Sequence, residues 1–152
     1  VLQPIIEMAA KSLNIEAHIE SVVTAEKIGP ALRRTLDHCD ILLALPDPLI
    51  HNQKNLLSIL LSSYHNQIPV IGFSASYVKA GAMLAVYSKP DQIGRQVAEV
   101  LKHQIRNPGA LPQPAFPSYF SIQSNRSVSR SLGIELPSDR VLINRLKWLE
   151  GG

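Results

Sequence analysis

The stretch CDILLALPDPLIHNQKNLLSILLSSYHNQIPVIGFSASYVKAGAMLAVYSKPDQIGRQVAEVLK, residues 39–102, decides the fold of this chain of 152 residues. Two continuous apolar runs within it, residues 41–45 and 70–73, have the length of strands. Apolar runs of this kind are typical of strands buried on both faces of a parallel α/β sheet. A third strand at residues 83–86 and intervening helices complete an alternating order. We therefore predict an α/β fold with a mainly parallel sheet.

The flanking sequence predicts further elements around this sheet. Apolar residues recur at helical spacing near the N-terminus, in the segment after Thr24, and again after Ser138. Loose alternation predicts two additional strands. The helices expected over the whole chain span about residues 5–13, 24–36, 47–65, 90–105, 125–132 and 138–149, with a short helix between the strands at 70–73 and 83–86, and the additional strands span 16–22 and 119–123. In the helix at 90–105, we expect Ile93, Val97, Val100 and Leu101 to face inward.

Composition excludes several functional classes. The formal net charge is only +3, and basic residues are spread along the chain without interleaved aromatic residues, so nucleic acid is not an expected partner. The single cysteine, Cys39, cannot form an internal disulfide. The five histidines show no metal-ligand spacing, and no phosphate-binding loop or nucleophile elbow is present. We therefore expect no metal, no cofactor and no enzymatic activity.

Candidate binding residues follow the predicted strands, because ligands of open α/β sheets bind beyond the carboxyl ends of the strands. Asp47 follows the first strand and is either a ligand contact or a turn residue. Phe73 and Ser74 end the second strand, and Tyr77 lies in the loop that follows it. Tyr87 ends the third strand, where its ring could stack on a ligand or serve only in packing. We predict these five side chains as the ligand-binding set.

Several short motifs occur in a recognisable order along the chain. They are Pro46-Asp47, Ile68-Pro69-Val70, Gly81-Ala82, Ile93-Gly94-Arg95-Gln96-Val97-Ala98-Glu99 and Ser129-Arg130-Ser131-Leu132-Gly133-Ile134-Glu135-Leu136-Pro137. In this order, the chain resembles the substrate-binding proteins of ABC transporters. The resemblance is to the branch with a type I periplasmic binding-protein fold whose better-known members bind aromatic amino acids. It spans roughly residues 20 to 140.

The resemblance implies an architecture. Such proteins have two Rossmann-like, three-layer α/β lobes that clamp the ligand between them. On this comparison residues 1–88 form the second lobe, residues 89–113 form a helix and linker that return toward the first lobe, and residues 114–152 form a crossing strand and C-terminal helices. The chain is then a fragment whose full-length precursor carries a signal peptide. An exposed lobe surface would favour a homodimer.

The implied function is solute binding outside the cytoplasm, in the periplasm or on the extracellular face of a bacterial membrane. The protein would bind a small, amino acid-like molecule and deliver it to an ABC permease in the membrane. An alternative is the ligand-sensing input domain of a signalling protein with the same fold. The chain departs from the family at Ser74-Ala75, where members often carry an acidic pair. This departure favours a less cationic ligand.

Overall fold

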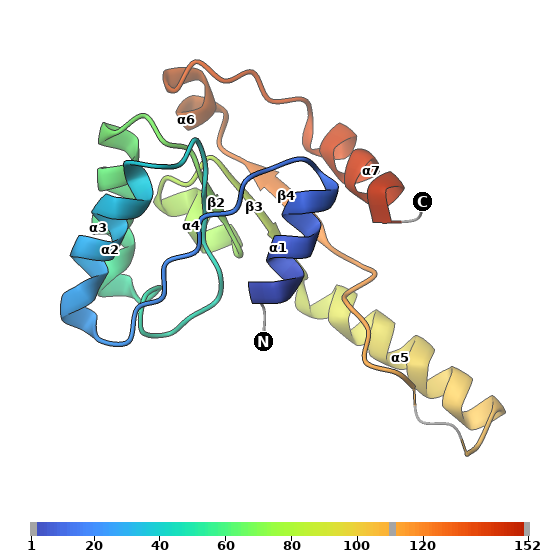
Figure 1. Ribbon diagram of the computed structural model, residues 1–152. Coiled ribbons are helices and arrows are strands. Elements are labelled where there is room, and N and C mark those ends of the chain that lie inside the picture. Colours follow the sequence, from blue (N-terminus) through green and yellow to red (C-terminus); the bar gives the residue numbers. More distant parts are fainter. Residues whose placement is uncertain (1–2, 110–111, 151–152) are drawn as a thin grey trace. The chain divides into compact units, whose positions relative to one another are not determined.

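The computed structural model describes residues 3–109 and 112–150 (Figure 1). The chain divides into two compact units, residues 1–70 and 71–152, and the division runs through strand β2. The first unit contains α1 (Gln3–Ser12), the short 3-10 helix η1 (Ala25–Lys27), α2 (Ile28–Leu36), β1 (Leu42–Leu43) and α3 (Gln53–His65). β2 (Val70–Gly72) leads into the second unit, with α4 (Ala75–Ala80), β3 (Leu84–Tyr87), α5 (Pro90–Arg106), β4 (Ser121–Ser124), α6 (Arg126–Ser131) and α7 (Asp139–Glu150).

The strands are ordered β1-β2-β3-β4 in one sheet. Within the first unit, the backbone N–H of Leu42 donates to the carbonyl of Pro69 just before β2, at 3.0 Å. Within the second unit, β2 runs parallel to β3, whereas β4 runs antiparallel to β3. The predicted α/β class with a mostly parallel sheet is confirmed.

The N-terminal part of the first unit differs from the expectation. Residues 15–23 contain no regular secondary structure, so the strand predicted at 16–22 is wrong. Alternation alone does not make a strand, because a strand also needs a neighbour for its backbone hydrogen bonds. The helix expected from Thr24 begins as the 3-10 turn η1, and the Thr24 side chain makes no capping bond. β1 is also shorter than its apolar run.

Helix α3 begins later than its sequence suggested. The expected start at Asp47 or Pro48 is wrong, because Asn52 is the N-cap and its side chain accepts a hydrogen bond from the N–H of Asn55 at 3.1 Å. Asparagine is among the best N-cap residues, since its oxygen satisfies a backbone donor of the first turn. Residues 47–52 instead form a turn before the helix.

The second unit is built on the β3–β4 pair. α4 packs on these two strands, and α7 packs along β4 (Figure 1). The hydroxyl of Ser124 on β4 donates to the carboxylate of Asp139 at 2.5 Å, at the first residue of α7. Arg126 donates to the carbonyls of Leu136 and Pro137 and so holds the connection between α6 and α7. These bonds fasten the C-terminal helices to the edge strand.

Helix α5 departs from the sequence prediction. No residue of α5 is buried, and Ile93, Val97, Val100 and Leu101 expose between 38 and 57% of their surface. The expectation that these four residues face inward is therefore wrong for the described chain. The apolar stripe exists, as the periodicity predicted, but among the described residues no element buries it.

Asn125 connects three elements of the second unit and yields a stability prediction. Its side-chain oxygen accepts from the N–H groups of Ser127 and Val128, which caps α6, and its amide donates to the carbonyl of Val78 on α4. We expect Asn125→Ala to lower the free energy of unfolding by about 1–2 kcal/mol, because it removes the cap and the bridging bond together. Urea denaturation followed by circular dichroism measures this loss.

Asn144→Ala is the matched control, since Asn144 is exposed on α7 and should change the free energy of unfolding by less than about 0.5 kcal/mol. Equal effects of the two substitutions would contradict the bridging role of Asn125.

Candidate functional site

The carboxyl ends of β2 and β3 define the candidate site. The strands are parallel neighbours, with Ile71 opposite Leu84 and Gly72 opposite Ala85. Their chain continuations, Phe73 after β2 and Ser88 after β3, therefore leave the sheet at the same edge. This edge is where open α/β sheets bind their ligands. We call the group Phe73, Ser74, Tyr77, Tyr87, Ser88 and Gln123 the edge cluster.

Gly72 brings two aromatic rings of the edge cluster together. A Cβ atom at Gly72 would lie 2.4 Å from Cβ of Tyr77, so only glycine allows Tyr77 to pack against β2. Tyr77 is 4% exposed, and its ring centroid lies 4.8 Å from that of Phe73, at an interplanar angle of 47°. Ala85, the register partner of Gly72, is fully buried and also small. Small residues on two neighbouring strands thus make room for α4.

Tyr87 is held by a hydrogen bond across the β3–β4 pair. Its hydroxyl donates to Oε1 of Gln123 at 3.1 Å. Tyr87 is paired in register with Ser121, so Gln123 is its diagonal neighbour on the same face of the sheet. The hydroxyl of Ser88 donates to the carbonyl of Tyr119 at 2.8 Å. Both contacts are half-buried, and they fix the end of β3 against the start of β4.

The chemistry of the edge cluster is neutral. Ser74 is the N-cap residue of α4, but its side chain makes no capping hydrogen bond. Burial raises the pKa of Tyr77 to about 12, so its phenol stays protonated at neutral pH. Besides the buried Tyr77, the cluster therefore offers two serine hydroxyls, an amide and the rings of Phe73 and Tyr87, and none of its six residues carries a formal charge. Such a surface suits a planar organic group with a few polar atoms.

Asp47 belongs to the first unit, where it stabilises a turn. Its Oδ1 accepts from the N–H of Leu49 at 2.8 Å and from that of Ile50 at 3.1 Å, and the residue is exposed. Burial lowers the pKa of the nearby His51, and the charge of Asp47 opposes that shift. The structure thus brings Phe73, Ser74 and Tyr77 together at one strand end, ties Tyr87 to Gln123, and gives Asp47 a separate local role.

Sequence reasoning missed Gln123. The alternation of residues 119–123 was visible, and it places Ser121 and Gln123 on one face of a strand. The alternation does not show which strand residues 119–123 pair with. In particular, nothing in the sequence pattern indicates that β4 runs antiparallel to β3. That pairing turns Gln123 into a neighbour of Tyr87.

In residues 3–109 and 112–150, no group of three or more His, Cys, Asp or Glu side chains could hold a metal ion. No helix in the same residues is long and apolar enough to cross a membrane. A hollow of about 220 Å³ lies between α2 and α3, and none of its lining residues belongs to the edge cluster.

Comparison with solved structures finds the same fold in other proteins. The chain superposes with a TM-score of 0.66 and 21% identity on a conserved domain protein from Vibrio cholerae. It superposes equally well, at 14% identity, on an ABC domain from Streptococcus pneumonia in complex with L-Trp. A third match, with a TM-score of 0.66 and 19% identity, is a ligand-free, open substrate-binding protein with adhesive properties from Clostridium difficile.

The extent of these matches is as informative as their quality. Each covers 90% of this chain but 46% of the solved chain, so this chain spans about half the length of the proteins it resembles. No protein-family model matches the sequence, and no curated protein matches it. At these identities the likeness shows the fold alone.

The close packing of Gly72 and Tyr77 predicts a non-additive pair of substitutions. Gly72→Ala should lower the free energy of unfolding by about 1–3 kcal/mol, because the added methyl group overlaps Tyr77. Tyr77→Ala removes the obstacle, so the double variant should be more stable than the sum of the two single losses predicts. Urea denaturation of the four proteins measures the coupling. A strictly additive result would contradict the packing.

The buried phenol predicts a decline in stability at high pH. Because desolvation raises the pKa of Tyr77 from 10.0 to about 12, the unfolded chain loses this proton before the folded chain does. The contribution of Tyr77 to the free energy of unfolding is complete below pH 10 and is lost as pH rises toward 12. In Tyr77→Phe this part of the decline should be missing, as shown by urea denaturation at a series of pH values.

The matched control is Tyr64→Phe, since Tyr64 is 41% exposed on α3 and should leave the wild-type decline unchanged. Identical pH profiles for Tyr77→Phe and the wild type would contradict the buried environment of Tyr77.

Proposed function

We propose that the chain is one lobe of an extracytoplasmic solute-binding protein that serves an ABC transporter. In this proposal residues 1–88 form the main part of the second lobe, and the remainder returns toward a first lobe. A small, amino acid-like molecule binds between the lobes and is handed to a permease in the membrane. The fold shared with substrate-binding proteins over 46% of their length supports the one-lobe assignment.

One observation carries the proposal: a neutral, aromatic and hydrogen-bonding edge lies at the carboxyl ends of two parallel strands. Phe73 and Tyr87 offer ring faces, while Ser74 and Gln123 offer polar atoms. These groups suit a planar ligand with polar substituents. A solved structure with the same fold holds L-Trp, which is a ligand of that chemistry.

Asp47 is the proposed contact for a positively charged group of the ligand. Its Oδ1 is used by two backbone N–H groups, and Oδ2 has no hydrogen-bond partner among the described residues. A carboxylate oriented by backbone donors is able to accept a hydrogen bond from an amine.

The proposed mechanism is a shift between open and closed forms. A ligand that contacts strand-end loops of both lobes binds the closed form better and so increases its population. Closure then presents the surface that the permease recognises. No bond is made or broken in this cycle, and we therefore infer a binding protein and not an enzyme. The solved neighbours described as an L-Trp complex and as an open substrate-binding protein support this inference.

The proposal predicts ligand-dependent thermal stabilisation. We expect the product of the complete reading frame that carries this chain to melt at a higher temperature with one or more aromatic amino acids, other amino acids, small carboxylates or nucleosides. A ligand at about 100 times its Kd adds about 2.7 kcal/mol of stability, so the shift should rise with concentration. Differential scanning fluorimetry of that product measures the shift.

Variants then locate the site. Phe73→Ala, Tyr87→Phe and Asp47→Ala should each weaken binding roughly five- to tenfold, because each removes one stacking or hydrogen-bonding group. Tyr64→Phe, which alters an exposed tyrosine on α3, should bind like the wild type. A well-folded protein that shows no shift with any of these ligands would contradict the proposed transport role and favour a sensory or scaffold role.

A further inference from the structure

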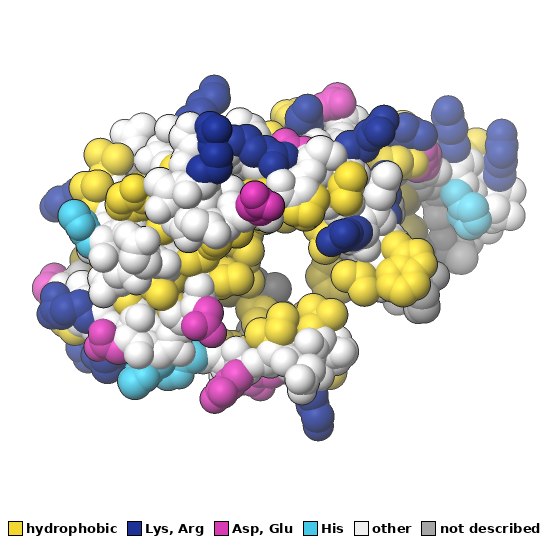
Figure 2. All heavy atoms as spheres, turned by 90° about the horizontal axis from the view of Figure 1, so that it is seen from above, with side chains coloured by type: hydrophobic (Ala, Val, Ile, Leu, Met, Phe, Trp, Pro, Cys, Tyr) yellow, Lys and Arg dark blue, Asp and Glu magenta, His cyan; other side chains and the backbone are white. Residues whose placement is uncertain are grey.

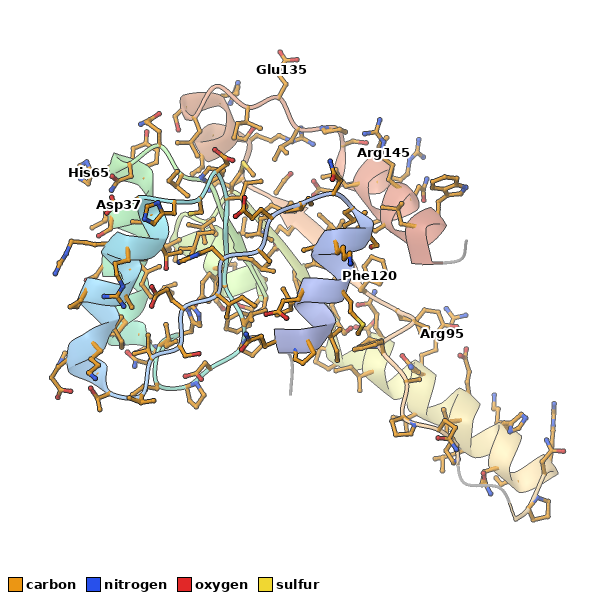
Figure 3. The ribbon with its side chains drawn as sticks, in the orientation of Figure 1. Asp37, His65, Arg95, Phe120, Glu135 and Arg145 are labelled. Atoms are coloured by element: carbon orange, nitrogen blue, oxygen red, sulfur yellow. The ribbon has the colours of Figure 1, made fainter. Side chains whose placement is uncertain are left out.

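The hollow of about 220 Å³ between α2 and α3 lies entirely within the first unit. Asp37, which follows α2, and His65, the last residue of α3, lie at the same end of the two helices, so the helices run in the same direction (Figure 3). Small residues line the hollow from both sides: Gly29 on α2, and Ser58 and Ser62 on α3. The distance between packed helices depends on the side chains at their contact, and small ones usually allow a close approach. Here they border an open space instead.

The floor of the hollow is apolar. Two of its lining residues belong to the core of the unit, since Ile28 is 8% exposed and Ile59 is 3% exposed. Leu32, which is half-buried, lines it as well. Water that touches such a floor finds no hydrogen-bond partner there. An apolar group that replaces this water is therefore favoured.

The rim of the hollow carries polar groups that the chain itself does not use. The side chains of Ser58 and Ser62 form no hydrogen bond with any described residue. The two serines are one helical turn apart on α3, so both hydroxyls lie on the side of the helix that borders the hollow. They remain able to donate to a bound molecule.

Arg33 adds a positive charge to the same rim. A Cβ atom built on Gly29 would lie 3.9 Å from Nη1 of Arg33, so the guanidinium lies back along α2 beside another lining residue of the hollow. Its neighbour Arg34 pairs with Glu20 at 2.8 Å, whereas Arg33 forms no ion pair with a described residue. No aspartate or glutamate is among the residues that line the hollow. The charge of Arg33 is thus left without a counter-charge there.

We propose that this hollow is a further binding site, which takes a small monocarboxylate with a short aliphatic chain. The planar guanidinium of Arg33 matches the two oxygens of a carboxylate, and the hydroxyls of Ser58 and Ser62 donate to the same group. The aliphatic chain covers the floor made by Ile28 and Ile59. Pockets for drug-sized ligands measure about 300–1,000 Å³, so a hollow of about 220 Å³ suits a smaller molecule.

The combination of features sets the hollow apart from the rest of the surface. Hydrophobic side chains reach the surface at several places (Figure 2), so apolar exposure alone does not define a site. In the hollow, a concave apolar floor meets two unbonded hydroxyls and a guanidinium without an ion pair among the described residues. None of its lining residues belongs to the edge cluster, so the site is independent of the solute binding proposed above.

The test measures how fast phenylglyoxal modifies individual arginines in the product of the complete reading frame that carries this chain. Peptide mass spectrometry follows Arg33 and, in the same sample, Arg145, which is exposed on α7 and serves as the internal control (Figure 3). We expect about 100 mM butyrate to slow the modification of Arg33 at least about fivefold relative to about 100 mM chloride. The modification of Arg145 should be the same in both salts.

Two sets of variants connect the protection to the hollow. Ser62→Leu fills the hollow but keeps Arg33, so butyrate should no longer protect Arg33. Ser127→Leu, at an exposed position on α6, is the matched control and should keep the protection. As a second measurement, butyrate should raise the melting temperature of the wild type and of Arg145→Gln but not that of Arg33→Gln.

Several results would overturn the proposal. Equal modification of Arg33 in butyrate and in chloride would refute the site, and protection that persists in Ser62→Leu would place the carboxylate elsewhere. Equal protection by n-butanol would show that the hollow does not select a charge. Equal protection by inorganic phosphate would show that it does not select an aliphatic chain, and either result refutes the proposed ligand class. Because the edge cluster takes no part, a failure of the proposed solute binding would leave these measurements unchanged.

Discussion

The absence of one methyl group, at Gly72, shapes the candidate site. Tyr77 occupies the space where that side chain would be, and its ring in turn supports Phe73 at the end of β2. Because α4 starts only three residues after β2, the helix must pass close to the sheet, and a larger residue at Gly72 would push it away. Ala85 on the neighbouring strand satisfies the same condition. The edge cluster is therefore a product of tight packing between strand and helix.

The same packing explains why the site is neutral. A buried phenol beneath the strand end is compatible with rings, hydroxyls and amides, whereas a carboxylate beside it would be costly to desolvate. The chain has Ser74 and Ala75 at the strand end, and the structure gives Ser74 the N-cap position of a short helix. Polar atoms with modest hydration can exchange water for a ligand at low cost. Selectivity at this edge would then rest on shape and hydrogen bonds.

Much of the fold could be predicted from the sequence, because the decisive signals are local. The apolar runs around Leu43 and Ile71 specify strands, and the stop signals after them place the loops at one edge. The expected burial holds for β2 but is wrong for β1, where Leu43 is 52% exposed. Elements that depend on distant partners could not be predicted. The segment 15–23 alternates like a strand but lacks a ladder, and the stripe on α5 has the period of a core helix but no cover in the described chain. Gln123 became a site residue only through the antiparallel pairing of β4. Periodicity shows which side of a helix or strand is apolar. Which other element packs against that side depends on the fold of the whole molecule.

Helix α5 and the chain that follows it form one long excursion from the sheet. Tyr87, the last residue of β3, and Ser121, the first residue of β4, are register partners, so the chain between them leaves and rejoins the sheet at one point. Two hydrogen bonds close this excursion, from the hydroxyl of Tyr87 to Gln123 and from the hydroxyl of Ser88 to the carbonyl of Tyr119. The ends of a long insertion are thus held together by residues of the candidate site itself.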